Sequence, residues 1–313
     1  MKPVFSVIIP VYNKAHTAGR ALGSVLEQSF PGFELIVVDD GSTDAIAEEI
    51  RKFKDDRIAV LQQPNRGASA ARNLGMERAE GQYIAFLDAD DFWEKDHLEE
   101  LLKLCRAFPK AGMYCTRYRK VFSERVQQAA VFKGIPDDFF GLLPDYFEAC
   151  GRDSVASASS VCMAAAVFET VGVFNTAMRS GEDTEMWIRT ALQYPVALNG
   201  KITVNYNLHI RESLSKARIG ANKLKLLSAF TSEERNHPAL KKYMDLNRYA
   251  LALNYTIQGD KDLRKEALQN LDLGNVNRKQ RLLLRLPGFF LKLLKKIQYR
   301  LARNGIFLSA FGC

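Results

Sequence analysis

Short apolar segments alternate with amphipathic segments through the first part of the chain. The apolar segments span residues 5–10, 34–38, 58–61 and 83–87, and apolar positions at helical spacing occur between them. Apolar runs of this length are typical of strands buried on both faces, and parallel neighbours of that kind need a helical crossover. The pattern therefore predicts an α/β fold, with an open, mostly parallel sheet flanked by helices.

The pattern becomes less regular after a helix predicted over residues 94–107. No element is assigned within residues 110–150, which suit either acceptor-binding elements or connecting structure. Residues 154–174 combine small residues with an apolar helix, and a further helix begins at Glu182. Residues 201–207 then alternate like a strand.

The basic charge of the chain is concentrated near its C-terminus. The net charge is +8, and residues 278–303 hold nine Lys or Arg and no Asp or Glu, so the remaining residues sum to −1. We predict a helical, basic C-terminal region over residues 216–313. Within it, Pro287 and Gly288 separate two helices, because proline cannot continue a helix.

The second of these helices, over residues 290–303, is amphipathic in helical projection. The side chains on its apolar side are Phe290, Leu293, Leu294, Ile297 and Leu301. Cations and Tyr299 occupy the other side. This arrangement favours binding to an anionic membrane surface. Docking of the apolar side on the rest of the chain or on a second subunit is the alternative.

Neither secretion nor a membrane span is expected. Residues 1–13 lead directly into a core strand without the order of a signal peptide, and the longest uncharged run, residues 154–168, is too short to span a bilayer. The five cysteines lack the close pairing of a zinc site. They are Cys105, Cys115, Cys150, Cys162 and Cys313. We expect reduced thiols in a cytoplasmic protein.

The apolar segment 83–87 ends in three carboxylates, Asp88, Asp90 and Asp91. Side chains alternate along extended backbone, so Asp88 and Asp90 should project to the same side just beyond the strand. At about 5 Å and an effective dielectric near 20 their repulsion is about 3 kcal/mol, and a bound divalent cation would turn it into attraction. A solvated acidic turn that caps the following helix is the alternative.

Other polar residues follow strands or lie near the same predicted edge, where open parallel sheets bind ligands. Asp40 could accept a hydrogen bond from a nucleotide base, Tyr12 could stack on it, and Asp88 could bind ribose. The sequence contains no glycine-rich dinucleotide motif and no P-loop, so phosphates need another partner, such as a cation on Asp90. Helix capping by Asp40, core packing of Tyr12 and a surface ion pair of Arg72 are the alternatives.

Further candidates lie downstream. Glu182 and Asp183 occupy the first turn of a predicted helix, where the helix dipole alone can explain acidic residues. His209 and Arg211 fall in a loop after residues 201–207. A lone histidine is usually structural, although one beside an acidic metal site can be a ligand.

Five segments in this order resemble the inverting family 2 glycosyltransferases, which have the nucleotide-sugar-binding GT-A fold. The segments are Ser-Val-Ile-Ile-Pro-Val-Tyr-Asn at 6–13, Val-Val-Asp-Asp-Gly-Ser-Thr-Asp at 37–44, Asn-Arg-Gly-Ala-Ser-Ala-Ala-Arg-Asn at 65–73, Phe-Leu-Asp-Ala-Asp-Asp at 86–91, and Gly-Glu-Asp with Met-Trp-Ile-Arg within 181–189. The resemblance implies a catalytic GT-A domain over residues 1–215, with residues 216–313 as a helical appendage.

The resemblance also implies roles for individual residues. Those that would bind the base, usually uracil, are Pro10, Tyr12, Asp40 and Arg72. Asp88 would contact ribose, Asp90 would bind a divalent metal, Mn²⁺ or Mg²⁺, and Asp183 would be the catalytic base. The Tyr-x-x-His-x-Arg-x-Ser-x-Ser segment resembles the family's flexible segment over the diphosphate, which gives His209 and Arg211 a place in the site.

By the same resemblance, the expected reaction is inverting transfer of a single sugar from a UDP sugar to a glycan or lipid-linked acceptor, in bacterial surface polysaccharide synthesis. The sequence lacks the Gln-x-x-Arg-Trp segment and the membrane spans of processive synthases. We expect a peripheral enzyme on the inner face of the cell membrane, with no nucleic-acid partner. The alternatives are a nucleotidyltransferase, for which residues 11–17 offer only Lys14 to a triphosphate, and a catalytically silent GT-A-like binding protein.

Overall fold

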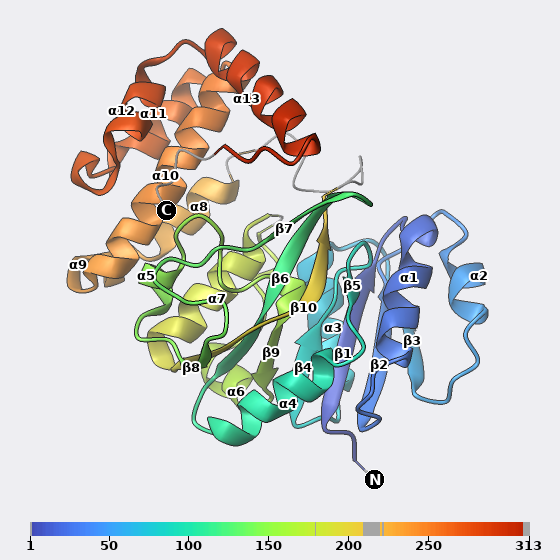
Figure 1. The fold of residues 1–313 in the computed structure, drawn as a ribbon. Coiled ribbons are helices and arrows are strands. Elements are labelled where there is room, and N and C mark those ends of the chain that lie inside the picture. Colours follow the sequence, from blue (N-terminus) through green and yellow to red (C-terminus); the bar gives the residue numbers. More distant parts are fainter. Residues whose placement is uncertain (1, 179, 209–219, 221, 309–313) are drawn as a thin grey trace.

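The computed structural model describes residues 2–178, 180–208, 220 and 222–308 of the chain. Within them, ten strands form one sheet in the order β3-β2-β1-β4-β9-β6-β10-β5, with β7 paired to β6 and β8 paired to β10 (Figure 1). The strands are β1 (Phe5–Val11), β2 (Phe33–Asp39), β3 (Ile58–Gln62), β4 (Tyr83–Phe86), β5 (Phe92–Trp93), β6 (Met113–Ser123), β7 (Val126–Ala129), β8 (Phe140–Leu142), β9 (Val161–Ala164) and β10 (Val196–Asn207). The helices are α1 (Ala15–Leu26), α2 (Ile46–Arg51), α3 (Ala68–Arg78), α4 (His97–Ala107), α5 (Tyr146–Ala149), α6 (Val167–Val171), α7 (Glu182–Gln193), α8 (Asn222–Ala229), α9 (Glu233–Asn236), α10 (Pro238–Gln258), α11 (Lys261–Gln269), α12 (Arg278–Arg285) and α13 (Gly288–Arg303), with 3-10 turns η1 (Ala158–Ser160) and η3 (Leu273–Asn275).

Six of the ten described strands share one direction. β1 pairs in parallel with β2 and β4, β2 with β3, and β6 with β10. β9 runs antiparallel to both β4 and β6, so β6 and β10 point the same way as the first four strands. β5, β7 and β8 are antiparallel to their neighbours. The predicted α/β class with a mostly parallel open sheet is confirmed, and the carboxyl ends of the six strands share one edge.

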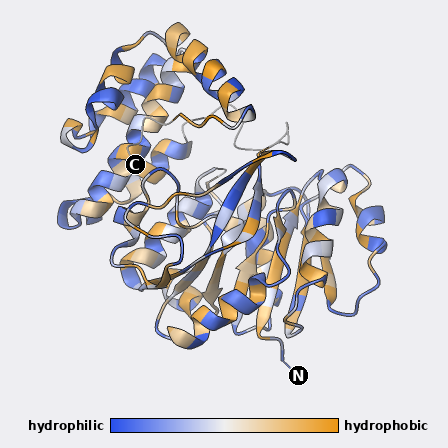
Figure 2. Cartoon of the chain, in the orientation of Figure 1, coloured by the Kyte–Doolittle hydropathy of each residue, from blue (hydrophilic) through white to orange (hydrophobic). Residues whose placement is uncertain are grey.

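Apolar side chains of β1 and the helices beside it form the centre of the core. Val7, Ile8 and Ile9 have no exposed surface, and Figure 2 shows hydrophobic residues concentrated on the strands. Leu22 and Val25 on α1 are also fully buried. Burial of side chains of this size stabilises a fold by about 1.5–3 kcal/mol each. The strands and helix that the pattern predicted here are present.

The apolar stretch over residues 154–174 folds differently from its prediction. It was expected to contain an apolar helix, but Val161–Ala164 forms strand β9, flanked by η1 and the short helix α6. β9 lies between β4 and β6 and runs antiparallel to both. Pairing on both sides satisfies the backbone of this short run, and a short apolar run carries no periodicity that separates strand from helix. Residues 110–150, left unassigned, supply β6, β7, β8 and α5.

The predicted helix over residues 94–107 begins three residues late. α4 starts at His97, because Phe92 and Trp93 pair with β10 as strand β5. The Trp93 indole Nε1 also donates a hydrogen bond to the Ser159 carbonyl oxygen over 2.7 Å. These long-range contacts hold the residues before His97 out of the helix.

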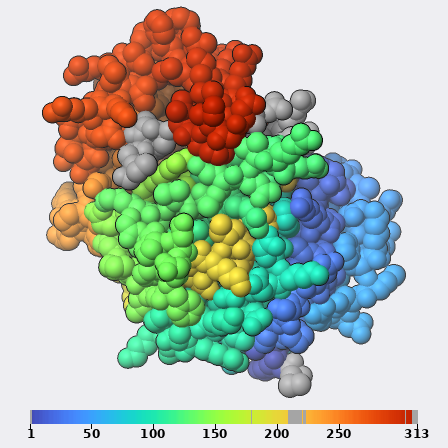
Figure 3. All heavy atoms as spheres, viewed as in Figure 1, coloured from blue at the N-terminus to red at the C-terminus, as the bar shows by residue number. Residues whose placement is uncertain are grey.

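The C-terminal helices form a lobe at one end of the molecule (Figure 3). Ring contacts join the lobe to α5, where Phe147 lies 5.1 Å from His237 and 5.7 Å from Tyr243 between centroids. Inside the lobe, Arg248 forms buried ion pairs with Glu234 at 2.5 Å and Asp245 at 3.0 Å. None of the helices that the structure describes has the length and apolar character needed to cross a membrane.

Candidate active site at the carboxyl edge of the sheet

The loop after β1 is held firmly against the loop after β2. The Asn13 side-chain oxygen accepts a hydrogen bond from the Thr43 N–H at 2.8 Å, and the Ala15 N–H donates to Asp44 Oδ2 at 2.8 Å. Asn13 has a φ of 51°, which is uncommon for a residue other than glycine. Its bond to Thr43 helps to offset the cost of that conformation. Lys14, between the two anchored residues, therefore has a fixed backbone position.

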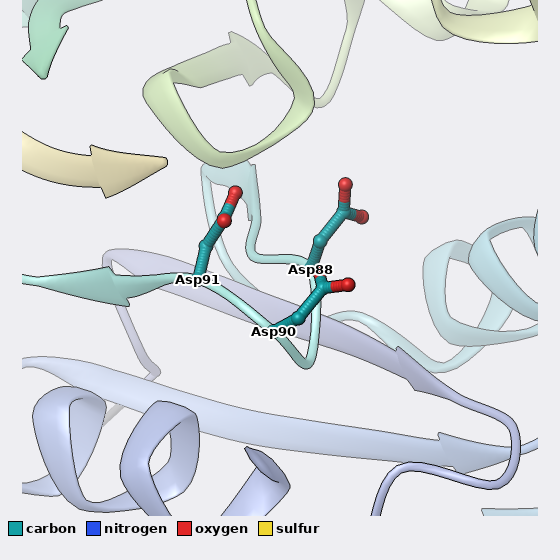
Figure 4. Close-up of side chains that lie close together, drawn as sticks. All are labelled: Asp88, Asp90 and Asp91. Atoms are coloured by element: carbon teal, nitrogen blue, oxygen red, sulfur yellow. The ribbon is translucent and has the colours of Figure 1, made fainter. Parts of the chain in front are cut away.

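An acidic cluster, formed by Asp88, Asp90 and Asp91, occupies the loop after β4 (Figure 4). One carboxylate oxygen from each residue lies within 4.8 Å of those of the other two. Carboxylate oxygens are the ligands that Mg²⁺ and Mn²⁺ prefer, so this set of donors fits a hard divalent cation. The geometry agrees with the expectation that Asp88 and Asp90 lie together at the end of this strand.

Asp90 and Asp88 are each paired with a different cation. The Lys14 ammonium donates to Asp90 Oδ2 at 2.9 Å, and the Arg72 Nη2 donates to Asp88 Oδ1 at 2.8 Å. Sequence analysis considered Lys14 only as a triphosphate contact, so its pairing with Asp90 was not foreseen. The two residues are 76 positions apart, and no local pattern relates them.

Asp91 is the most buried member of the acidic cluster, at 2% exposure. It accepts hydrogen bonds from the Ser159 hydroxyl at 2.6 Å and the Asn207 N–H at 2.8 Å. Burial raises the pKa of Asp91 well above its ordinary value, and the charges of Asp88 and Asp90 raise it further. Sequence analysis gave Asp91 no role. Its contacts show that it ties the loop after β4 to η1 and to the end of β10.

Arg72 joins the acidic cluster to the first turn of α7. Its Nη1 donates to Glu182 Oε1 at 3.0 Å while its Nη2 binds Asp88, and the residue is only 4% exposed. Burial by itself would lower the pKa of this guanidinium, but the carboxylates of Asp88, Glu182 and Asp183 outweigh it and raise the pKa. The alternative of an ion pair on the surface is wrong, because the Arg72 guanidinium is buried and its partners Asp88 and Glu182 are only partly exposed. Burial and the Asp183 charge raise the pKa of Glu182, which Arg72 opposes.

Asp183 lies half-buried beside Glu182 in the first turn of α7. Its Oδ1 accepts hydrogen bonds from the N–H of Thr184 at 2.6 Å and from the Thr184 hydroxyl at 3.2 Å. Tyr206, at the end of β10, faces the same group of acids. Burial raises the pKa of Tyr206, and the acidic cluster together with Asp183 raises it further. Sequence analysis used Tyr206 only as the start of a loop motif, so its place near the acids was missed.

Asp40 lies at the end of β2 and is 3% exposed. Its Oδ1 accepts from the Gln63 side chain at 2.6 Å and the Arg66 N–H at 2.8 Å, and its Oδ2 accepts from the Gly67 N–H at 2.8 Å. These bonds fix the loop between β3 and α3. Asp40 does not cap α2, whose N-terminal residue bonds to Asp44.

The remaining predicted residues divide into two groups. Tyr12 follows β1 and is 47% exposed, so its ring is open to a ligand instead of packed in the core. Pro10 is half-buried near the end of the same strand. His209 and Arg211 lie outside the residues that the structure describes.

Comparison with known proteins places part of the chain in a family. Residues 6–145 match the family model described as glycosyl transferase family 2. An uncharacterized glycosyltransferase of Rickettsia felis is 35% identical over 250 residues, which cover 76% of this chain and 38% of the relative. The Escherichia coli UDP-Glc:alpha-D-GlcNAc-diphosphoundecaprenol beta-1,3-glucosyltransferase WfgD is 42% identical over 95 residues, covering 30% of this chain and 38% of the relative. The chain thus matches about two fifths of the length of these relatives.

A solved structure shows the same fold over nearly the whole chain. The crystal structure of S. aureus TarS 1–349 in complex with UDP-GlcNAc has a TM-score of 0.68 and 21% identity, covering 99% of this chain and 93% of that one. The fold and the family model together give the class, a glycosyltransferase with the GT-A fold. By its residues 6–145, the chain belongs to glycosyltransferase family 2.

Proposed function

We propose that the chain is a metal-dependent, inverting glycosyltransferase that moves a single sugar from a UDP sugar to a hydroxyl of a glycan or lipid-linked acceptor. The observation that carries the proposal is the bridge made by Arg72, which holds the first turn of α7 against the acidic cluster. This bridge supports a donor site and a catalytic base that lie side by side. The names of two similar proteins support the donor, since WfgD is named for UDP-Glc and TarS was crystallised with UDP-GlcNAc. The diphosphoundecaprenol in the name of WfgD supports a lipid-linked acceptor in bacterial surface polysaccharide synthesis.

In the proposed reaction, the Asp183 carboxylate accepts the proton of an acceptor hydroxyl. The hydroxyl oxygen forms a bond to the anomeric carbon from the face opposite the nucleoside diphosphate. The bond from that carbon to the diphosphate oxygen breaks, and UDP leaves with the bonding electron pair. The anomeric configuration therefore inverts.

The donor would be held by residues that follow β1, β2 and β4. We propose that Tyr12 stacks on the base, that Pro10 and Asp40 line its pocket, and that Asp88 binds ribose. Arg72 would have two roles at this site. It would contact the base, and its ion pair would hold Asp88 in position. A divalent cation, Mn²⁺ or Mg²⁺, would be held by Asp90 and would neutralise charge on the diphosphate.

The remaining proposed contacts to the diphosphate are His209 and Arg211. This assignment rests on the resemblance of their segment to the one that closes over the diphosphate in family 2 enzymes. Both are cationic or can become so, which suits a diphosphate.

The test is stabilisation of the full-length protein by nucleotide sugars in the presence and absence of Mn²⁺. A donor at about 100 times its dissociation constant should add roughly 2.7 kcal/mol to the free energy of unfolding. Asp90→Asn should keep the fold and lose the response of UDP binding to Mn²⁺, whereas Asp262→Asn, at an exposed acid on α11, should keep it. Unchanged affinity and metal response in Asp90→Asn would reject the role of Asp90. Release of pyrophosphate from UTP and a sugar phosphate, without release of UDP from nucleotide sugars, would indicate a nucleotidyltransferase.

We also propose that residues 1–215 form the catalytic domain and residues 216–313 a helical appendage. α10 is the centre of the appendage, since α8, α9, α11, α12 and α13 all contact it. The buried ion pairs of Arg248 join α9 to α10 from within. An appendage with its own polar and apolar interior can present α13 without disturbing the catalytic site.

The outer face of α13 is proposed to bind an anionic membrane surface. α13 packs on α10, and the buried face of α13 carries Leu291 and Ala302, which are 4% and 8% exposed. The apolar side chains beside that face are 44–47% exposed; they are Phe290, Leu293, Leu294 and Ile297. This part of the predicted apolar side is therefore open to solvent rather than docked on the rest of the described chain. Together with the lysines of α13 it supports a peripheral place on the inner face of the membrane, next to a lipid-linked acceptor.

A further inference from the structure

Lys14 occupies the position of a counter-ion at Asp90. The lysine Nζ is 2.9 Å from Asp90 Oδ2, and both side chains are 18% exposed. Among the described residues, Lys14 is the only cation within ion-pair distance of Asp90, because Arg72 pairs with Asp88 instead. The same carboxylate is the one proposed to hold the divalent cation.

Hydrogen bonds fix the backbone on both sides of Lys14, whereas its ammonium lies at the end of a flexible side chain. Asn13 donates its N–H to the Ser42 hydroxyl at 3.0 Å, and Ala15 donates its N–H to Asp44 at 2.8 Å. Within the described part of the chain, the end of the side chain has one contact, the ion pair with Asp90. Lysine carries its charge on a flexible four-carbon stem, so the ammonium can swing while the loop stays in place.

A divalent cation and an ammonium cannot both lie against one carboxylate oxygen without strong repulsion. The diphosphate of a nucleotide sugar offers the ammonium an alternative anionic partner in the same site. We infer that Lys14 neutralises Asp90 in the free protein and gives way to the divalent cation when a nucleoside diphosphate binds, pairing then with the diphosphate. This inference rests on the proposed function and adds cooperativity to it. The metal and the nucleotide strengthen each other's binding because Lys14 changes partners.

The exchange of partners makes metal affinity depend on the nucleotide. Mn²⁺ alone must displace Lys14, so its binding to the free protein is weakened. With UDP present, Lys14 has moved and the metal binds more tightly, and by linkage Mn²⁺ must strengthen UDP binding by the same factor. Lys14→Gln removes the competitor and the diphosphate contact together. It should therefore change the two affinities in opposite directions.

The experiment is calorimetric titration of the full-length protein with Mn²⁺ alone, with UDP alone, and with UDP at saturating Mn²⁺. A partly exposed ion pair contributes up to about 1 kcal/mol, so Lys14→Gln should bind Mn²⁺ alone about three- to fivefold more tightly. It should bind UDP about tenfold more weakly, because a charged hydrogen bond is lost. Lys14→Arg, which keeps the cation, should stay close to wild type in both titrations. Lys110→Gln removes an exposed lysine elsewhere and should change neither affinity.

The outcomes separate this inference from the proposed function. If the wild-type protein binds no UDP, the proposed function is wrong. If it binds UDP but Lys14→Gln leaves the Mn²⁺ affinity unchanged or weaker, Lys14 is a simple phosphate contact or a structural residue, and the inference is overturned. UDP binding that is independent of Mn²⁺ in the wild type would also overturn it. Should Lys14→Gln fail to fold by circular dichroism, Lys14→Ala is measured under the same criteria.

Discussion

The acidic edge of the sheet and the outer face of α13 differ in whether their charged side chains form ion pairs. At the edge, Asp88 and Asp90 are paired with Arg72 and Lys14, and Asp91 is satisfied by a hydroxyl and a backbone N–H. On α12 and α13, none of the described lysines and arginines forms an ion pair with Asp or Glu. The C-terminal lobe as a whole does not lack ion pairs, because Arg248 is paired in its interior. The contrast is therefore between two surfaces of the molecule, and not between the lobe and the rest of the chain.

The difference teaches what kind of partner each surface suits. The ion pairs and hydrogen bonds at the acidic edge hold its carboxylates in fixed positions, as the binding of a small ligand requires. Lys14 is the member of these pairs that we infer to move when the ligand binds. Unpaired cations beside exposed apolar side chains gain most from a broad anionic surface with an apolar interior. Four predictions test this contrast, from the largest expected effect to the smallest.

Asp183→Asn tests the residue that we propose as the catalytic base. Loss of a general base should lower sugar transfer by about 10²–10⁴-fold while UDP binding is retained. Transfer is measured with a panel of UDP sugars, and binding by calorimetry. The matched control is Asp262→Asn, another acid in the first turn of a helix, which should leave transfer intact. Near-normal transfer by Asp183→Asn would move the role to Glu182 or leave both acids as partners of the helix dipole.

Arg72→Met tests whether internal pairing stabilises the edge. The substitution leaves Glu182 and Asp88 without their cation, and Glu182 has only 12% of its side chain exposed. Removing one member of a buried pair costs about 3–5 kcal/mol, and the partial exposure of Asp88 favours the lower end. Urea unfolding followed by circular dichroism measures the change. Lys133→Met, at an exposed pair with Glu148, should cost less than about 1 kcal/mol. Equal effects from both would remove the contrast between the surfaces.

His97 tests the same region with a buried group that has no counter-charge. Burial lowers the pKa of His97 to about 3. In the unfolded chain its pKa is about 6.5, so the unfolded state takes up the proton first as the pH falls, and stability is lost from pH 6.5 downward. The loss at pH 5 is about 2 kcal/mol relative to pH 7.5.

The measurement is urea unfolding at pH 7.5 and pH 5.0 for wild type and His97→Gln. The variant loses the Thr203 contact to His97 Nδ1, so its absolute stability falls, but its dependence on pH should flatten. His16→Gln, at an exposed histidine, should keep the wild-type slope. A wild-type slope in His97→Gln would mean that other groups carry the acid sensitivity.

Lys292→Gln and Lys296→Gln test the open face of α13. Each lysine near an anionic surface contributes about 1 kcal/mol, so each substitution should weaken binding to phosphatidylglycerol vesicles about fivefold at low salt. Stability should change by less than about 0.5 kcal/mol, since both residues are exposed. Lys110→Gln is the charge-matched control. Truncation before Arg278 should abolish sedimentation with vesicles and leave a folded domain that binds UDP.

A negative result assigns the face to another partner. If the full-length protein does not sediment with these vesicles at low salt, the apolar side chains are left to a second copy of the chain, which analytical ultracentrifugation would show. If truncation unfolds the catalytic domain, the tail is a packing element. In either case the open charge of α13 would no longer indicate a membrane.

Local pattern was enough for the regular part of the fold. The first four strands and α13 follow from runs and periodicities within a few residues, and the break at Pro287 follows from proline itself. The candidate residues Asp40 and Asp88 could be placed at the sheet edge for the same reason. Each follows a strand, and parallel strands end at a common edge. Strand β5 was not predicted and β9 was wrongly predicted as part of a helix, because short apolar runs become strands only where a neighbouring strand accepts their hydrogen bonds.

By itself, the sequence determined which residue types stand at the ends of the strands, and hence that acids gather at one edge. Tertiary structure decided which cation each acid meets. Lys14 and Asp90 are 76 positions apart, and Arg72 and Glu182 are 110 apart, so no periodicity relates them. Their pairing depends on how β1, β4 and α7 pack, and packing is set by the burial of apolar surface along the whole chain. The open face of α13 has the same origin, because a helix buries the side that its neighbours cover, and α13, which packs on α10, buries Leu291 and leaves Leu293 exposed.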